Sequence, residues 1–154
     1  MKETAVLLHD IRSAHNVGSI FRTAEAAGVS RLYISGYTPL PQDRFGRVQK
    51  EIAKVALGAE HSLSWQRVAS PKALISTLKR RGWTIIGVEQ HPRSVDYRKC
   101  KLATPALFVF GHEVTGVSRS LLKACDAIVE IPMHGAKESL NVAVAAGVVL
   151  FSVR

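Results

Sequence analysis

Hydrophobic residues along the chain follow two patterns, short continuous runs and longer segments with helical spacing. Five short runs are typical of buried strands: residues 5–9, 32–35, 83–89, 105–110 and 127–131. Five segments have the spacing or end signals of helices: residues 16–27, 47–56, 70–81, 118–124 and 139–153. Because strands and helices alternate and the strands are apolar throughout, the pattern predicts one α/β domain over residues 1–154, a parallel sheet with flanking helices.

The expected ends of these elements carry residues that commonly cap or break helices. Asn16 is the expected N-cap of the first helix, and Gly28 ends it. Pro71 suits the first helical position of its segment. Residues 36–46 contain two prolines and are expected to form an exposed loop. The last helix, residues 139–153, is apolar on nearly every side, which suits burial on several sides.

Composition sets several classes of protein aside. The chain has 154 residues, of which 47% are hydrophobic, enough to bury a core. Its longest apolar run, residues 142–151, is far shorter than the roughly 20 residues of a membrane-spanning helix. The apolar stretch of the first ten residues is too short for a signal peptide. Cys100 and Cys125 form no pairing motif, so we expect a reduced, cytoplasmic protein without membrane association, with one disulfide as the alternative.

Positive charge is concentrated in the middle of the chain. The formal net charge is +9, and residues 44–101 hold thirteen basic against four acidic side chains, whereas the two flanks are balanced. Two basic clusters lie in residues 79–81 and 93–101. A further cluster has near-helical spacing and comprises Arg44, Arg47, Lys50 and Lys54. Each cluster alone could be ordinary solvated surface, but three in one segment favour contact with nucleic-acid phosphates.

Polar and glycine residues gather in three segments that follow predicted strands: residues 9–22, 110–118 and 131–141. Ligands of open α/β sheets bind at the carboxyl ends of strands. The first segment is expected to bring Asn16, Ser19 and Arg22 near one helix start. Gly111 would let a ligand approach the backbone closely, and Gly116 would allow a sharp turn. Each segment taken singly fits helix capping and turn formation equally well.

Motifs of several other enzyme classes are absent. No glycine-rich dinucleotide fingerprint follows a strand, and no phosphate-binding loop with Gly-Lys-Ser/Thr occurs. The histidines lack metal-ligand spacing, and no Gly-x-Ser-x-Gly nucleophile motif is present. The sequence therefore indicates neither a Rossmann nucleotide enzyme, nor an NTPase, nor a zinc site.

In order along the chain, the three segments resemble the motifs of the SpoU/TrmH family of the SPOUT superfamily, which are knotted RNA ribose methyltransferases. Residues 16–22 (NVGSIFR) resemble N-x-G-S/T-x-x-R, and residues 110–118 (FGHEVTGVS) resemble G-x-E-x-x-G. Residues 131–145 resemble I-P-M-x-G followed by S-L-N-V-A/S-V-A. The resemblance spans roughly the whole chain. We expect a bare catalytic domain, without the N-terminal RNA-binding extension of many members.

The resemblance implies a fold, a reaction and partners. It implies a deep C-terminal trefoil knot and a homodimer that contacts RNA through both subunits. It also implies transfer of a methyl group from S-adenosyl-L-methionine to a ribose 2′-hydroxyl of tRNA or rRNA. The methyl group leaves a sulfonium, so the donor needs no metal.

The resemblance also assigns roles to single residues. It implies that Arg22 is the catalytic arginine; because a guanidinium is normally protonated, positioning and charge stabilisation are its surer role, and base action remains a hypothesis. The other residues implied in catalysis are Asn16, Glu113, Ser139 and Asn141. Those implied in cofactor binding are Gly111, Ile131, Met133 and Leu140. The basic middle, with Arg44, Arg47, Lys50 and Lys54, is expected to bind RNA.

Two alternatives remain open at this point. The chain could be a non-catalytic RNA-binding module that kept the fold, although such a module should have lost the reactive residues. It could also be a knotted methyltransferase that acts on a base, although the segment at residues 16–22 favours ribose.

Overall fold

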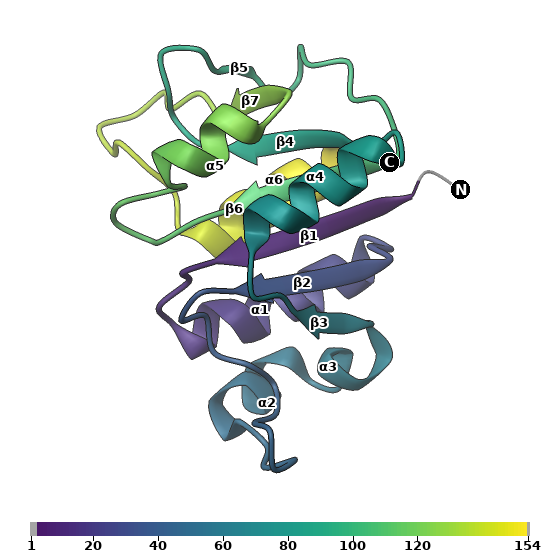
Figure 1. Cartoon of the computed structure of the whole chain (residues 1–154). Coiled ribbons are helices and arrows are strands. Elements are labelled where there is room, and N and C mark those ends of the chain that lie inside the picture. The colour runs from purple at the N-terminus through teal and green to yellow at the C-terminus, as the bar shows by residue number, and fades with distance from the viewer. Residues whose placement is uncertain (1–2, 154) are drawn as a thin grey trace.

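Seven parallel strands form one sheet in the order β3-β2-β1-β6-β4-β7-β5 (Figure 1). The computed structural model describes residues 3–153, so the predicted domain limits at residues 1 and 154 lie outside the described residues. The strands are β1 (Thr4–His9), β2 (Arg31–Ser35), β3 (Trp65–Arg67), β4 (Thr84–Val88), β5 (Val95–Asp96), β6 (Ala106–Phe110) and β7 (Ala127–Glu130). The predicted parallel α/β sheet is thus confirmed.

Helices cover both faces of the sheet, which gives three layers. The helices are α1 (Ala14–Ala26), α2 (Lys50–Ala56), α3 (Ala59–Ser62), α4 (Pro71–Arg80), α5 (Arg119–Ala124) and α6 (Val142–Ser152). Alternate residues of β1 point to opposite faces, as in any strand. Leu8 belongs to the core shared with α1, α2, α3 and α6, whereas Leu7 belongs to the core shared with α4 and α5. Burial on both faces explains why the central strands are apolar throughout.

The first and the last helix begin at residues other than those predicted. The first helix begins at Ala14, because Ser13 is its N-cap and accepts the backbone N–H of Asn16. Asn16 is therefore not the cap, and its amide is available for other contacts. The last helix begins at Val142 rather than at residue 139, because the side chain of Asn141 caps it.

Other differences from the sequence prediction concern short or loop segments. The basic helix α2 begins three residues later than the predicted start at residue 47. Strands β3 and β5 and helix α3 were missed, since elements of two to four residues are too short for a periodic pattern. The loop at residues 36–46 is only partly exposed, because Thr38 is buried and accepts the backbone N–H of Ile11.

Both cysteines are free thiols, so the disulfide alternative is wrong. Burial raises the pKa of Cys125 to about 11 and that of Cys100 in the same direction. Within residues 3–153, no helix is both long and apolar enough to span a bilayer.

Close packing between α1 and α2 depends on Gly18. A Cβ atom at Gly18 would lie 2.7 Å from the carbonyl oxygen of Ile52, which is backbone and cannot swing aside. At Gly147 in α6, by contrast, a Cβ atom would lie 3.5 Å from the Thr23 methyl group, an ordinary contact. The glycine of the first motif thus serves helix packing rather than ligand binding.

We predict that Gly18→Ala destabilises the protein although alanine favours helices. The clash with α2 is of the kind that costs about 1–3 kcal/mol, which outweighs a helix-propensity gain of about 1 kcal/mol. Gly147→Ala is the matched control, and it should raise the thermal midpoint by about 2–4 °C. Thermal unfolding of both variants checks this, and an unchanged or higher midpoint for Gly18→Ala would contradict it.

Candidate functional site

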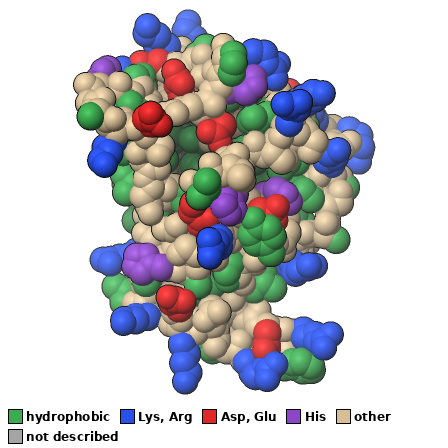
Figure 2. Space-filling model, turned by 90° about the vertical axis from the view of Figure 1, so that its left-hand side faces the viewer, with side chains coloured by type: hydrophobic (Ala, Val, Ile, Leu, Met, Phe, Trp, Pro, Cys, Tyr) green, Lys and Arg blue, Asp and Glu red, His purple; other side chains and the backbone are tan. Residues whose placement is uncertain are grey.

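Loops from three neighbouring strands line a pocket at the carboxyl edge of the sheet. The strands β6, β4 and β7 lie side by side and end at this edge. Figure 2 looks onto the edge and shows a hollow with hydrophobic side chains in its upper half. The lining includes Val88 at the end of β4, Gly111 and Glu113 after β6, and Ile131 after β7. This arrangement matches the site expected for a ligand of an open α/β sheet.

The pocket brings together residues that the sequence predicts from separate motifs. All four residues predicted to bind the cofactor line it, namely Gly111, Ile131, Met133 and Leu140. Glu113 and Ser139, predicted for catalysis, line it as well. The pocket is therefore built from the second and third motifs, and their roles in binding stay predictions.

Side-chain hydrogen bonds join Glu113, Asn16 and Asn141 across the three motifs. Asn16 Nδ2 donates to Glu113 Oε1 at 3.1 Å, and Asn141 Nδ2 donates to Asn16 Oδ1 at 3.1 Å. Asn141 Oδ1 in turn accepts the N–H groups of Ala143 and Val144 at the start of α6. The starts of α1 and α6 and the loop after β6 are thereby fixed to one another at the pocket. We name these three side chains the amide–carboxylate chain.

Glu113 is held as a carboxylate by the start of α1. Its Oε2 accepts the N–H of Arg12 at 3.0 Å, and its Oε1 accepts the N–H of Ser13 at 3.1 Å. Partial burial acts to raise its pKa, but the bonds from Arg12, Asn16 and Ser13 outweigh this effect and lower the pKa below its ordinary value. A negative charge at a helix start is also favoured by the helix dipole.

The loop after β6 is shaped by its two glycines and by Glu89. A Cβ atom at Gly111 would lie 2.5 Å from the Gly116 oxygen and the Val117 nitrogen. The absence of a side chain at Gly111 thus lets the loop close on itself. This packing alone accounts for the glycine, without the expected close approach of a ligand. Gly116 has a φ of +74°, which confirms the predicted sharp turn.

Glu89 is a site residue that the sequence interpretation missed. Its Oε2 accepts the N–H of Val117 at 2.9 Å, and its Oε1 accepts the N–H of Gln90 at 2.9 Å. The carboxylate therefore ties the loop after β6 to the end of β4, beside the pocket it lines. The available signal was a charged residue at the carboxyl end of a predicted buried strand.

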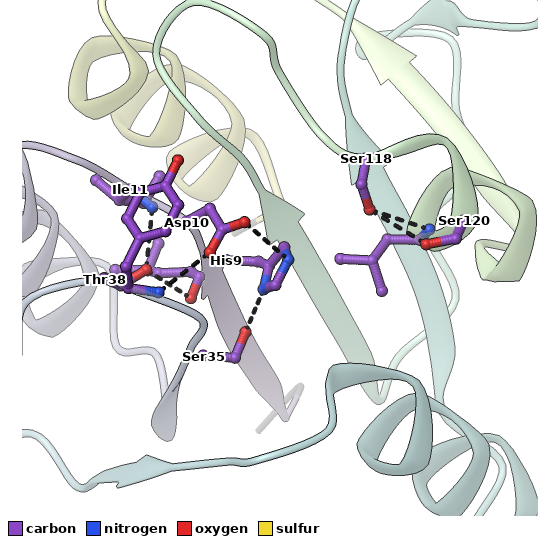
Figure 3. A network of polar contacts seen from close by, with 10 residues as sticks. His9, Asp10, Ile11, Ser35, Thr38, Ser118 and Ser120 are labelled. Carbon is purple, nitrogen blue, oxygen red and sulfur yellow. Dashed lines mark hydrogen bonds and ion pairs between the residues drawn. The ribbon is translucent and has the colours of Figure 1, made fainter.

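A second polar network supports the segment before α1 (Figure 3). His9 Nδ1 lies 2.8 Å from Ser35 Oγ, and His9 Nε2 lies 3.3 Å from Asp10 Oδ2. The order resembles a serine–histidine–aspartate triad, but Ser35 is only 1% exposed and no substrate can reach it. Asp10 also accepts the N–H of Tyr37. The network instead fixes the loops after β1 and β2, and the loop after β1 supplies the N–H groups that bind Glu113.

Arg22 lies outside the pocket. It is exposed on α1 and is not among the residues that line the cavity. Because the helix begins at Ala14, Arg22 stands more than two turns from the helix start. The expectation that it lies near the helix start beside Asn16 is therefore wrong.

The basic clusters of the middle segment occupy different parts of the molecule. The loop before α2 and α2 itself carry Arg44, Arg47, Lys50 and Lys54, all exposed. Lys and Arg side chains gather around this lower end in Figure 2. In the other clusters, Lys79 pairs with Asp126 at 2.9 Å and Arg98 pairs with Asp96 at 2.6 Å. The first cluster has an ion pair as well, between Arg47 and Asp43 at 2.6 Å, so all three are partly neutralised. The third cluster adjoins β5, at the opposite edge of the sheet from β3.

Within the described part of the chain, no group of three or more His, Cys, Asp or Glu side chains could hold a metal ion. The pocket offers instead carboxylate, amide, apolar and backbone groups. Such a lining suits a small organic ligand with a few polar edges.

The fold and this site define an α/β protein with a candidate ligand pocket at the carboxyl ends of β4, β6 and β7. A model of the SpoU rRNA Methylase family matches residues 3–151, and the chain belongs to that family.

Relatives of known name extend this finding. The chain is 36% identical over 150 residues to a Staphylococcus saprophyticus protein assigned to the TrmH family of tRNA/rRNA methyltransferases. It is 35% identical over 149 residues to the 23S rRNA (guanosine-2′-O-)-methyltransferase RlmB of Neisseria meningitidis. Each match covers 97% of this chain but 57% of the relative. The chain thus spans little more than half the length of these relatives.

Solved structures share the fold. The AdoMet-bound rRNA methyltransferase of Sinorhizobium meliloti superposes with a TM-score of 0.89 at 30% identity, over 100% of this chain and 57% of that one. The A. aeolicus TrmH/SpoU tRNA modifying enzyme superposes with a TM-score of 0.85 at 28% identity, over 99% of this chain and 74% of that one. The α/β architecture is therefore that of SpoU methyltransferases.

We predict that Glu113→Gln lowers stability in a pH-dependent way. The folded-state pKa lies below the ordinary value of 4.5, so the carboxylate stabilises the fold above that value and ceases to do so as pH falls through the lowered one. At pH 7 the thermal midpoint should fall by about 2–4 °C, as expected when bonds worth ~1 kcal/mol are lost. The difference from the unmodified protein should shrink near pH 3.

The control is Glu25→Gln, which changes an exposed carboxyl group on α1. Its midpoint should follow that of the unmodified protein at both pH values. An equal loss at pH 7 and pH 3 for Glu113→Gln would show that the charge of Glu113 does not hold the loop.

Proposed function

We propose that the chain is a single catalytic domain that transfers a methyl group from S-adenosyl-L-methionine to a ribose 2′-hydroxyl of structured RNA, either tRNA or rRNA. The observation that carries the proposal is the amide–carboxylate chain, in which hydrogen bonds join Asn16 and Asn141 to Glu113, the member of the chain that lines the pocket. Membership of the SpoU family and the activities named for the relatives support it. A non-catalytic module would have no reason to retain this complete set.

The pocket suits the cofactor by its chemistry. An adenine ring is a flat apolar surface with a few polar edges, and Ile131, Met133 and Leu140 offer apolar side chains around it. Backbone groups beside Gly111 would bind its edges. When bound, the cofactor supplies a methyl group on a positively charged sulfur. The AdoMet-bound state of two structural neighbours supports this assignment.

The protein side of the reaction is alignment of a weak nucleophile. A neutral hydroxyl reacts slowly unless it is held in line and helped to lose its proton. Asn16 and Asn141 hold the starts of two helices in register with Glu113, and Ser139 lies at the pocket beside them. In this proposal Arg22 positions the ribose and the adjacent phosphate through its bidentate guanidinium.

The exposed position of Arg22 supports a homodimer, in which one subunit completes the site of the other. Because Arg22 is exposed and outside its own pocket, a second copy would bring it to the pocket of the first. Helix α6 offers an apolar face for such contact, since Val144 and Phe151 are each 53% exposed. Four residues of α6 are buried in the core, namely Ala143, Ala146, Val149 and Leu150, so two large exposed apolar side chains on the same helix favour a partner.

The remaining parts of the proposal concern RNA, topology and location. The cluster of Arg44, Arg47, Lys50 and Lys54 would bind phosphates. We further propose that the chain is knotted like its family. In support, the segment after β7 contacts Gln90, whose Nε2 donates to the Glu138 oxygen at 2.6 Å, before α6 packs against α1. Free thiols and an RNA substrate fit a cytoplasmic location.

We predict that the protein labels ribose when it is incubated with methyl-labelled cofactor and separate tRNA and rRNA fractions. After digestion, label should appear in 2′-O-methyl nucleosides. Label in base-methylated nucleosides would favour the base methyltransferase. Absence of label from every fraction, with RNA still bound, would favour the non-catalytic module.

We predict that Asn141→Ser impairs turnover while sparing the fold. Serine still caps α6, but it lacks the Nδ2 group that donates to Asn16. A small displacement at the site should lower kcat by about 100-fold. Turnover and thermal midpoint are measured together, and wild-type kcat in this variant would contradict the role of the amide–carboxylate chain.

We predict that Arg22→Ala and Asn141→Ser, each inactive alone, complement one another when mixed and allowed to exchange subunits. Half of the dimers are then mixed, and one of their two sites is intact, so activity should return to about a quarter of the unmodified level. No recovery in proven mixed dimers would show that Arg22 serves its own subunit. A concentration-independent monomer mass in sedimentation would contradict the proposed homodimer.

The variant Arg22→Lys keeps the positive charge but loses the bidentate guanidinium, so turnover should fall. Wild-type turnover in this variant would contradict the bidentate role.

A further inference from the structure

The loop between β2 and α2 ends in a hairpin tip, residues 43–47, which projects at the lower end of the molecule (Figure 1). An antiparallel bridge between Gln42 and Val48 closes it. Backbone bonds from Asp43 N–H to the Arg47 oxygen and from Gly46 N–H to the Asp43 oxygen form its turn, each at 3.0 Å. The tip is therefore a hydrogen-bonded hairpin turn rather than an irregular loop.

Asp43 fixes the tip from within. Its Oδ1 accepts the N–H groups of Phe45 at 2.8 Å and of Arg47 at 3.0 Å, and its Oδ2 accepts Arg47 Nε at 2.6 Å. The carboxylate of Asp43 therefore fixes the backbone at Phe45 and Arg47 and, in addition, the side chain of Arg47. The bonds from Arg47 are also the main cause that lowers the pKa of Asp43.

Phe45 presents its ring to solvent between two cations. The side chain is 67% exposed, so it serves no core. The guanidinium carbons of Arg44 and Arg47 lie 4.8 Å and 5.1 Å from the ring centroid. Within residues 3–153 no ion pair involves Arg44, so one of the two cations keeps its full charge for a ligand. Both guanidinium groups lie over the exposed ring, and a base that stacks on the ring takes the place of one of them. Aromatic rings and arginines of this kind together bind unpaired nucleotides.

We propose that Phe45 is a stacking platform for an unpaired base of the RNA, while Arg44 and Arg47 contact the phosphates beside that base. The inference rests on the proposed function, because it takes RNA as the partner, and it adds that the RNA at this tip is single-stranded. A paired base is already stacked on both sides and offers no free face to the ring.

The tip adjoins the helix that carries Arg22. It leads directly into α2, and α2 packs against α1 at Gly18. The pocket, by contrast, lies at the ends of β4, β6 and β7. The base held by Phe45 is therefore not the nucleotide in the pocket of the same subunit, and this second contact helps to select the substrate.

The test compares a labelled single-stranded RNA with the duplex that it forms with its complement, by fluorescence anisotropy at several salt concentrations. Phe45→Leu keeps an apolar side chain but removes the aromatic face. It should weaken binding of the single strand at least about fivefold, leave the duplex within about twofold, and leave the salt slope unchanged. Phe45→Trp should restore single-strand binding.

Two control variants separate stacking from charge and from exposure. Arg44→Gln should weaken both RNAs and reduce the salt slope by about one. Leu57→Asn removes an apolar side chain that is as exposed as Phe45, at 66%, and should change neither affinity. Its φ of 51° suits asparagine, so the change does not strain the backbone.

Three outcomes would overturn the inference. Equal weakening of single strand and duplex by Phe45→Leu would mean that the ring only shapes the hairpin. Unchanged binding of both would mean that the ring contacts no base. A changed sedimentation coefficient in Phe45→Leu would make the tip a protein interface. If the unmodified protein bound neither RNA, the proposed function would fail as well, which distinguishes that failure from the other three.

Discussion

The carboxylate of Glu113 is the interaction on which the arrangement of the site depends. It is carried by a loop after the buried strand β6, yet it is bound by the backbone at the start of α1 and by Asn16. Asn16 then contacts Asn141, which caps α6. One negative charge therefore joins segments that are about a hundred residues apart in sequence. Without it, three motifs would lie near each other but in no fixed register.

Two further sets of polar contacts hold the segments that bind and carry Glu113. The His9–Asp10–Ser35 network holds the loop after β1, which presents the N–H groups to Glu113 (Figure 3). Glu89 holds the other end of the loop that carries Glu113. The turn closes on Gly111, where Gly116 and Val117 leave no room for a side chain. The pocket is thus preformed by hydrogen bonds within the chain, as the proposed alignment of a ribose hydroxyl would require.

The sequence predicts the central strands, the long helices and the order of the site loops well, because each depends on local pattern. The pocket lining followed from motifs, and Gly111, Ile131, Met133 and Leu140 do meet. The residue at which the first helix begins was harder to predict. Ser13 and Asn16 are both good caps, and only the contact of Asn16 with Glu113 decides between them. The exposed position of Arg22 depends on tertiary packing and is not visible in local pattern, whereas Glu89 leaves only the signal of a charged residue at the end of a predicted strand.

Both margins of the sheet are formed by very short strands, three residues in β3 and two in β5. Few main-chain groups are thus open for pairing with another strand, which protects the protein against edge-to-edge aggregation. The same shortness limits how two copies could associate. Extension of the sheet from one subunit into the next would gain few hydrogen bonds, so stable self-association is left to helical surfaces such as α6. The fold therefore steers contact between copies toward the helices that begin at the site.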